Sequence, residues 1–186
     1  MRAQRESSSL APTLLLSMPQ MLDENFERTV VLLCDHSAEG AFGLILNRPT
    51  TTAAAEAVAF DPPIEVHQGP LLWTGGPVEP QRGWILLGQP VDEDAQTQIA
   101  PDLYISTSIE LLRKVIQETP VRTRVLTGYA GWGPGQLDQE LAASAWLTVD
   151  VDPVLIFDTP ADEMWDQALR RLGTGPGSLQ VGQGVH

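Results

Sequence analysis

Cysteine and lysine are nearly absent from this 186-residue chain, and each shortage excludes a class of protein. With one cysteine, Cys34, no disulfide can form within the chain, which is typical of proteins from a reducing compartment. Lys114 is the single lysine, and the formal net charge is −13 at pH 7. An acidic surface repels a phosphate backbone, because binding to it depends on lysine and arginine. We therefore expect no direct binding to nucleic acid.

Long hydrophobic runs are also missing. The longest aliphatic runs, residues 14–16 and 30–34, are far shorter than the roughly 20 residues that a membrane helix needs. Arg2 and Arg5 resemble the start of a secretion signal, but Glu6 and serines follow them instead of an apolar segment of about 7 to 15 residues. The sequence therefore predicts a soluble, cytosolic protein without a membrane partner.

The residues that are present suit a single domain. Hydrophobic residues make up 42% of the chain, which is enough for an ordinary core. We assign this domain to residues 13–173. Residues 1–12 lack an apolar pattern and are expected to be a disordered N-terminus, and residues 174–186, rich in glycine, are expected to be a flexible tail.

Apolar periodicity and turn residues predict both strands and helices. Thr107 and Glu110 match a capping box at the start of a helix, and Thr159 with Pro160 is typical of another helix start. Residues 88–101 lack periodicity and predict a surface loop. The predicted strands are 14–18, 29–34, 41–47, 64–68, 71–74, 84–87, 103–106, 122–127, 146–149 and 154–157, and the predicted helices are 51–60, 109–118, 136–143 and 161–172.

The stretch G-Y-A-G-W-G-P-G-Q-L-D-Q-E-L, residues 128–141, is the first site candidate. We expect a loop between a strand and a helix, because glycine adopts backbone conformations that other residues avoid. Three interpretations remain open. The glycines can form a tight corner, or they can cradle a phosphate, although the G-x-G-x-x-G spacing fails at Gln136 and Asp138 repels an anion. The third is a neutral-ligand or partner site built on Tyr129, Trp132 and Gln136.

Two further features, the Cys34–His36 pair and Arg82, are candidates for a catalytic or ligand-binding role. Cys34 and His36 are two residues apart near a strand end, where side chains share a face, and an imidazole can activate a thiol. The alternative is a buried cysteine acting as a small apolar residue. Arg82 lies between glycine turns and is either a surface residue or an anion anchor. The three histidines lack metal-site spacing, so we expect no metal and no cofactor.

Several stretches stand out together along the chain: Met18-Pro19 with Asp23 and Phe26, T-V-V-L-L-C-D-H, G-A-F-G-L-I-L-N-R-P, G-G-P-V with Arg82-Gly83, S-T-S at 106–108, the glycine-rich stretch 128–141, Ala145-Trp146-Leu147, Phe157-Asp158, Trp165, Ala168-Leu169 and Leu172-Gly173. Over about residues 14 to 173 they resemble the YqgE/AlgH family of bacterial proteins. This resemblance implies an α+β fold with a bent, partly barrel-like mixed β-sheet and flanking helices. It also implies a regulator of alginate production and transcription for the AlgH branch, and it supplies no catalytic residues.

These observations favour a non-enzymatic regulatory or binding protein that acts through a protein or small-molecule partner. Its predicted surface joins glycine-containing turns with aromatic and polar residues. A thiol-dependent or hydrolytic enzyme that uses Cys34 and His36 is the first alternative, and a direct transcription factor is the second, against which the acidic charge weighs. The residues of the predicted surface are Asn47, Gly75, Gly76, Pro77, Arg82, Tyr129, Trp132 and Gln136.

Overall fold

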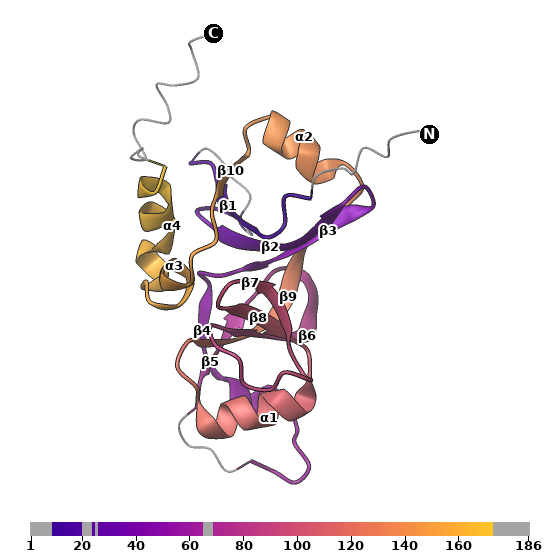
Figure 1. Cartoon of the computed structure of the whole chain (residues 1–186), viewed down its shortest axis with the longest axis vertical. Helices are drawn as coiled ribbons and strands as arrows, with labels where there is room; N and C mark the ends of the chain where they lie inside the picture. The colour runs from indigo at the N-terminus through magenta and orange to yellow at the C-terminus, as the bar shows by residue number, and fades with distance from the viewer. Residues whose placement is uncertain (1–8, 20–23, 25, 65–68, 173–186) are drawn as a thin grey trace.

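A computed structural model describes residues 9–19, 24, 26–64 and 69–172 (Figure 1). The predicted flexible tail and most of the predicted disordered N-terminus lie outside these residues. So does most of the strand predicted at residues 64–68. Among the described helices, none combines the length and the hydropathy that crossing a bilayer requires.

Ten strands in the described residues form one curled, half-barrel sheet, so the predicted α+β fold with a bent mixed sheet is confirmed. Along the main path the order is β10-β1-β2-β3-β9-β6-β8-β7, and all neighbours on it are antiparallel. β5 pairs in parallel with β9 and antiparallel with β4. The strands are β1 (Thr13–Ser17), β2 (Val30–Ser37), β3 (Gly40–Ile45), β4 (Pro49–Ala53), β5 (Leu71–Thr74), β6 (Val78–Leu87), β7 (Thr97–Ala100), β8 (Leu103–Ser106), β9 (Thr123–Trp132) and β10 (Trp146–Val149).

Helices cover the sheet in three places. Figure 1 shows α2 above β1, β2 and β3, α3 and α4 beside them, and α1 at the opposite end beyond β5, β6 and β8. β9 joins the two halves, because it pairs with β3 at one end and with β5 and β6 at the other. The helices are α1 (Ile109–Glu118), α2 (Gln136–Ala142), α3 (Pro153–Phe157) and α4 (Ala161–Arg170), with a short 3₁₀ turn, η1, at Ala54–Glu56.

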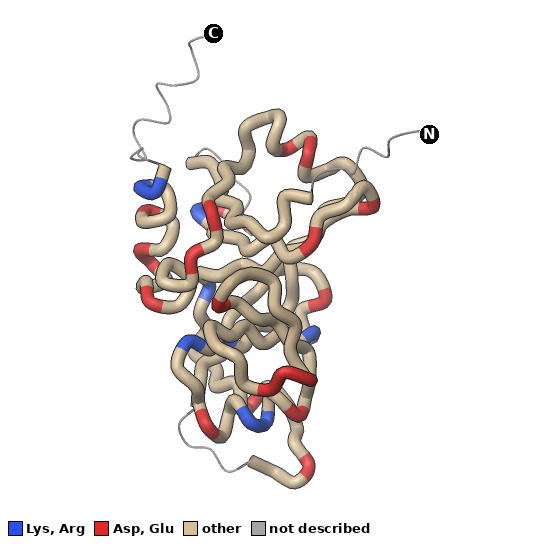
Figure 2. The backbone as a smooth tube through the Cα atoms, in the orientation of Figure 1, with Lys and Arg blue, Asp and Glu red and all other residues tan. Residues whose placement is uncertain are grey.

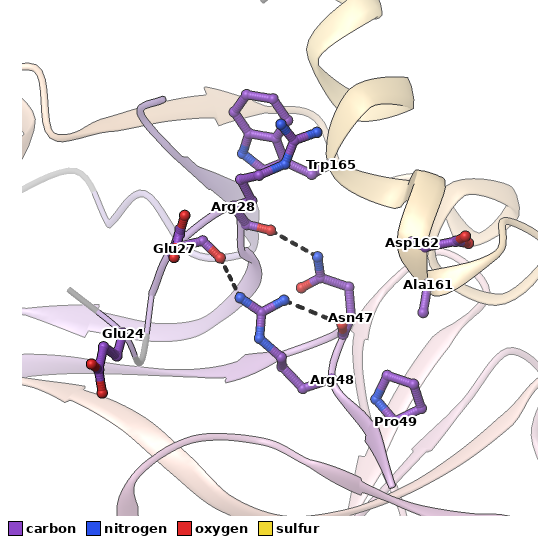
Figure 3. Close-up of a pocket in the computed structure, with 9 residues that line it drawn as sticks. All are labelled: Glu24, Glu27, Arg28, Asn47, Arg48, Pro49, Ala161, Asp162 and Trp165. Carbon is purple, nitrogen blue, oxygen red and sulfur yellow. Dashed lines mark hydrogen bonds between the residues drawn. The ribbon is translucent and has the colours of Figure 1, made fainter. Parts of the chain in front are cut away.

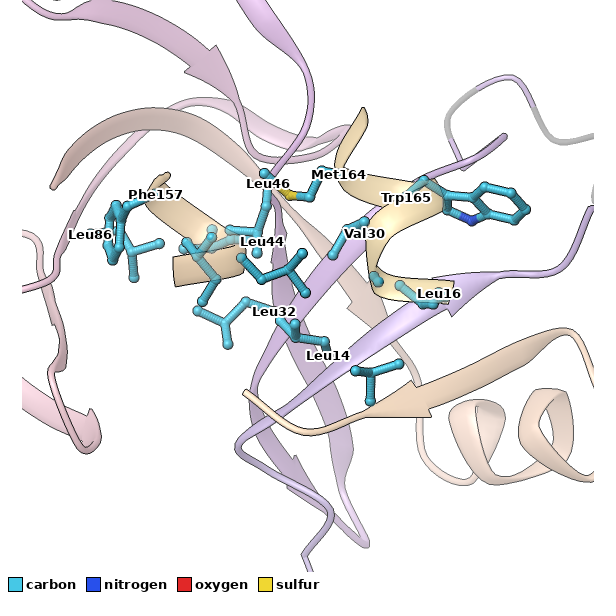
Figure 4. Close-up of a cluster of buried hydrophobic side chains, with 14 of the residues drawn as sticks. Leu14, Leu16, Val30, Leu32, Leu44, Leu46, Leu86, Phe157, Met164 and Trp165 are labelled. Atoms are coloured by element: carbon cyan, nitrogen blue, oxygen red, sulfur yellow. The ribbon is translucent and has the colours of Figure 1, made fainter. Parts of the chain in front are cut away.

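β1 and the first half of β2 are buried on both faces, which explains why residues 14–16 and 30–33 are continuous apolar runs. In β1, Leu14 and Leu16 pack in the central cluster against α3 and α4 (Figure 4). Leu15 belongs to the cluster beneath α2. A third cluster lies beneath α1 and includes Leu112 and Ile116. Because successive side chains of a strand point to opposite faces of the sheet, the leucine run of β1 contributes to two different clusters.

Three predicted elements were wrong in type. Residues 51–60 do not form a helix: Thr50 to Thr52 belong to β4, because β-branched residues favour strands and β5 supplies a partner. Residues 154–157 form helix α3, not a strand, since Asp152 accepts a hydrogen bond from the Val154 amide and Pro153 suits the first helical position. The predicted loop 88–101 contains β7.

Two cap assignments and the glycine-rich loop also need correction. Ser108, not Thr107, caps α1, because its hydroxyl accepts a hydrogen bond from the Leu111 amide at 3.2 Å. The residue before α4 is Pro160, and Thr159 instead donates to the Val154 carbonyl. Residues 128–132 are not a loop, because they continue β9 to Trp132. The chain therefore turns only between β9 and α2.

Candidate functional site

A cleft of about 670 Å³ opens across the neighbouring strands β3, β9 and β6. β3 contributes Phe42, β9 contributes Tyr129, and β6 contributes Trp84 and Arg82. A volume of this size is within the range of small-molecule and peptide-side-chain sites. We call it the aromatic cleft; the residues that line it are Asp35, Ser37, Glu39, Gly40, Ala41, Phe42, Val78, Arg82, Trp84, Tyr129, Gly131 and Trp132.

Three aromatic rings form the wall of the aromatic cleft. Phe42 stacks on Trp84 with ring centroids 5.5 Å apart, and Tyr129 meets each of these rings edge-on at 6.2 Å. Trp84 is buried, whereas Phe42 and Tyr129 are half-buried and face the cleft. Since each ring is held by two others and by the sheet, the wall is formed before any ligand arrives.

Arg82 reaches the aromatic cleft from a bulge in β6. Val78 pairs with Tyr129 and Gly83 pairs with Thr127, so residues 79–82 protrude opposite a single residue of β9. The Arg82 guanidinium carbon lies 4.7 Å from the ring centroid of Trp84 and 6.0 Å from that of Tyr129. Arg82 Nη1 is 3.3 Å from a carboxylate oxygen of Glu79. Bulges of this kind redirect side chains next to functional sites.

The backbone of Glu79 is strained, with a φ of 44°. Non-glycine residues hold such angles at a cost, and these angles concentrate at functional sites. Here the strained backbone lies where the Glu79 carboxylate contacts both Arg82 and Tyr129. Burial, and then the hydrogen bond with Glu79, raises the pKa of Tyr129. The phenol therefore stays protonated and neutral at physiological pH.

Gly75, Gly76 and Pro77 support the base of this bulge. A Cβ atom on Gly76, whose φ is 157°, would lie 2.0 Å from the Tyr129 carbonyl carbon, so only glycine fits. The Gly75 amide donates to Thr127 and its carbonyl accepts from Ile45, each at 2.7 Å. These residues bring the β5–β6 turn against β9 and do not line the aromatic cleft.

Trp132 and Gln136 contribute less than the sequence predicted. Trp132 lies three residues after Tyr129, so its side chain points to the opposite face of β9. There it packs against Phe26 and Trp146, with ring centroids 6.5 and 5.8 Å away, and contributes to the cluster beneath α2. The Gln136 side chain accepts a hydrogen bond from the Gly133 amide at 3.0 Å and tightens the turn before α2.

Asn47 lies apart from the aromatic cleft, in a second cavity of about 560 Å³ (Figure 3). Both ends of its amide group are engaged: Oδ1 accepts from the Val30 amide and Nδ2 donates to the Arg28 carbonyl, each at 3.0 Å. Beside it, Arg48 donates to the carbonyls of Asn47 and Glu27, and burial lowers the pKa of Arg48. The structure thus uses Asn47 to fix the chain before β2.

Cys34 and His36 do not form the predicted dyad. Cys34 packs against the central cluster, on the same face of β2 as Val30 and Leu32, and a bulge between Leu33 and Asp35 then changes the face that His36 occupies. His36 instead directs Nε2 to Asp138 at 3.2 Å and accepts a hydrogen bond from the Leu10 amide on Nδ1. Burial, with a smaller contribution from Asp35, raises the pKa of the thiol to about 12, so the nucleophilic thiolate is scarce at neutral pH.

Metal-binding geometry is likewise missing from the part of the chain that the structure describes. No group of three or more histidine, cysteine, aspartate or glutamate side chains there is arranged to hold a metal ion.

Comparison with known proteins places this architecture in a family. The model of the AlgH-like family matches residues 14–177. The chain belongs to the AlgH-like family. Curated relatives named UPF0301 protein include one from Sinorhizobium medicae, 37% identical over 97% of this chain and 94% of the relative. Another, from Bordetella avium, is 40% identical over 87% of this chain and 84% of the relative.

Solved structures show the same AlgH-like fold. The solution structure of the AlgH protein from Pseudomonas aeruginosa is 33% identical, with a TM-score of 0.73 and coverage of 99% of both chains. The crystal structure of protein DIP2367 from Corynebacterium diphtheriae is 26% identical, with a TM-score of 0.65 over 86% of this chain and 85% of the other.

The sequence did not predict several residues of the aromatic cleft. Phe42 and Trp84 occur in ordinary strand patterns, and nothing in the sequence shows that β9 brings them to one face. No sequence pattern marks Asp35, Glu39 and Glu79 as residues at or beside a cleft either. The one signal was the odd run V-E-P-Q-R-G, whose proline and glycine inside an apolar strand are typical of a bulge.

Proposed function

We propose that this chain is a non-enzymatic, cytosolic binding protein that regulates a partner by holding part of it in the aromatic cleft. The observation that carries the proposal is the packed trio of Phe42, Trp84 and Tyr129, with Arg82 laid over it from the strained bulge. Aromatic residues that combine a broad apolar face with a polar group are enriched at recognition surfaces.

The chemistry of the cleft supports binding over catalysis. A nucleophile with a nearby base is the usual mark of covalent catalysis. Cys34 has a raised pKa and its neighbour His36 is engaged elsewhere. The residues at the aromatic cleft instead offer flat apolar faces, a cation and carboxylates, which hold a ligand without supplying such a pair.

Direct regulation through DNA has less support. The net charge of −13 opposes a phosphate backbone, and Figure 2 shows acidic residues on both halves of the molecule, with few basic ones between them. Regulation through a protein or a small-molecule partner is compatible with this charge.

The experiment fills the aromatic cleft with a side chain introduced at Gly131, one of the residues that line it. A Cβ atom on Gly131 would meet Tyr129 at 3.4 Å, an ordinary contact, so Gly131→Leu places a side chain in the cleft at little cost to the backbone. Gly83→Ala is the matched control, because a Cβ atom there meets nothing within 4 Å and Gly83 does not line the cleft. Each variant is immobilised and exposed to a bacterial lysate, and retained proteins and small molecules are identified by mass spectrometry.

We expect a set of species that the wild type and Gly83→Ala retain and Gly131→Leu loses. Circular dichroism and thermal melting establish that each variant is folded. If folded Gly131→Leu retains the same species as the wild type, the aromatic cleft is not the binding site and the proposal is wrong.

A further inference from the structure

We infer that the group held in the aromatic cleft is a cation, and specifically the guanidinium of an arginine side chain in an exposed segment of a partner protein. This inference rests on the proposed function and names the chemistry of its occupant. Aromatic faces attract cations through their quadrupole, and arginine is the cation that stacks best on them.

The charges around the cleft complement a cation. Asp35 and Glu39 line the cleft, and Glu79 lies on the adjoining bulge. Among the described residues at the cleft and its bulge, the one cation that opposes these carboxylates is Arg82, which is already paired with Glu79. Figure 2 shows acidic segments at the β2–β3 hairpin, which carries Asp35 and Glu39. An incoming cation therefore meets two carboxylates that have no basic partner among the described ion pairs.

Arg82 shows that a guanidinium fits these rings. Its guanidinium carbon is 4.7 Å from the Trp84 centroid, with the Glu79 carboxylate 3.3 Å from Nη1. A planar cation between an aromatic face and a carboxylate is the arrangement that we propose for the partner's arginine. Arg82 thus occupies part of the site that the ligand takes, as an internal substitute.

Arg82 is also held weakly enough to leave. About half of its side chain is exposed, 51%, as is that of Glu79, 54%. Exposed ion pairs contribute little to stability because water and salt screen them. Arg82 lies on the bulge of residues 79–82, all of which are exposed, so it can swing out without disturbing the sheet.

The remaining volume favours a protein segment over a free amine. A guanidinium needs only a fraction of the 670 Å³ cleft. Beside the rings the floor is formed by Gly131, which has no side chain, and by Val78, which is 37% exposed. This floor leaves room for the backbone and neighbouring side chains of a segment in which arginine is the anchor, as is common at interfaces.

The test measures whether removal of the Arg82 side chain strengthens or weakens the binding of an arginine-containing peptide. Isothermal titration calorimetry compares capped pentapeptides Gly-Gly-X-Gly-Gly, where X is arginine, citrulline or aspartate, on the wild type, Arg82→Ala, Gly131→Leu and Gly83→Ala. Citrulline keeps the shape of arginine and removes its charge. Arginine amide, without flanking residues, serves as the small cation.

We expect the arginine peptide to bind, and to bind Arg82→Ala about threefold or more tightly than the wild type, because the internal competitor is gone. The citrulline peptide should bind about tenfold more weakly than the arginine peptide, and Gly131→Leu should abolish binding while Gly83→Ala preserves it. Arginine amide should bind more weakly than the peptide.

Four results overturn the inference. Weaker binding of the arginine peptide to Arg82→Ala, or preferential binding of the aspartate peptide, would show an anion site that uses Arg82. Equal affinity for arginine amide and the peptide would assign the cleft to a small cation. Failure of the arginine peptide to bind the wild type, with lysate species still lost on Gly131→Leu, would refute the arginine inference and leave the proposed function standing.

Discussion

The indole Nε1 of Trp165 donates a hydrogen bond to the backbone carbonyl of Ser17, 2.9 Å away and 148 residues earlier in the chain. Both residues are fully buried, at 2% and 0% exposure, so this bond fastens α4 to the end of β1. The guanidinium of Arg28 covers the same indole ring at 4.6 Å and pairs with Asp166 at 3.0 Å. The contacts of this one indole therefore join α4 to the end of β1 and to the segment before β2.

Replacing Trp165 by phenylalanine should lower the free energy of unfolding by about 1 to 3 kcal/mol, because the Ser17 carbonyl loses its partner in a dry environment. Urea denaturation followed by circular dichroism measures this change. Gln167→Ala, on the exposed side of α4, is the control and should change stability by no more than about 0.5 kcal/mol. Equal stabilities for Trp165→Phe and the wild type would contradict the role assigned to this bond.

Gly76 should tolerate no side chain. Gly76→Ala places its Cβ 2.0 Å from the Tyr129 carbonyl carbon at a φ of 157°, so β5 and β6 must move away from β9. We expect a loss of about 3 kcal/mol or more in thermal or chemical unfolding, as is usual for overpacking combined with backbone strain. Gly133→Ala is the matched substitution, since its Cβ meets only Gln136 at 3.8 Å. Similar losses for the two variants would show that the close approach at Gly76 is not specific.

Asn47 should prove to be structural. Asn47→Ala leaves the Val30 amide and the Arg28 carbonyl without their partner, which should cost about 1 to 3 kcal/mol of stability. Asn47→Asp keeps the acceptor for Val30 but loses the donor to Arg28, so it should also destabilise. Because Asn47 does not line the aromatic cleft, neither variant should change the species retained in the lysate experiment while it remains folded. A selective loss of those species with unchanged stability would give Asn47 a binding role.

Cys34 should be slow to alkylate in the folded protein. Burial raises the pKa of its thiol from 9.0 to about 12, so at pH 8 we expect iodoacetamide to react much faster after unfolding in urea. This difference in pKa makes the free energy of unfolding depend on pH. Above pH 9 the unfolded state releases the thiol proton of Cys34, whereas the folded state keeps it. The contribution of Cys34 is therefore complete below pH 9 and is lost as the pH rises from 9 towards 12. Cys34→Ala should show a smaller loss of stability over this range, and rapid alkylation of the folded wild type at pH 8 would contradict the assignment.

Local patterns predicted part of the fold for identifiable reasons. The strands at residues 14–18 and 71–74 and the helix from Ile109 are correct, because apolar runs and the Ser-rich helix start carry their signals within a few residues. The helix predicted at 51–60 failed because alanine propensity was outweighed by the pairing of β4 with β5. The strand predicted at 154–157 failed because its apolar run is buried as α3 against the central cluster, and burial alone does not distinguish a helix from a strand.

The sequence alone determined the supply of apolar residues for the core, the acidic charge, the single thiol and the positions of the glycines. The tertiary structure decided which residues meet. Tyr129 joins Arg82 because β6 and β9 are neighbours in the sheet, and Asn47 is separated from them although it was predicted on the same surface. A bulge in β2 sends Cys34 and His36 to different surroundings. The physical reason is that register and bulges are set by pairing between distant strands, and a shift of one residue changes the face that every later side chain occupies.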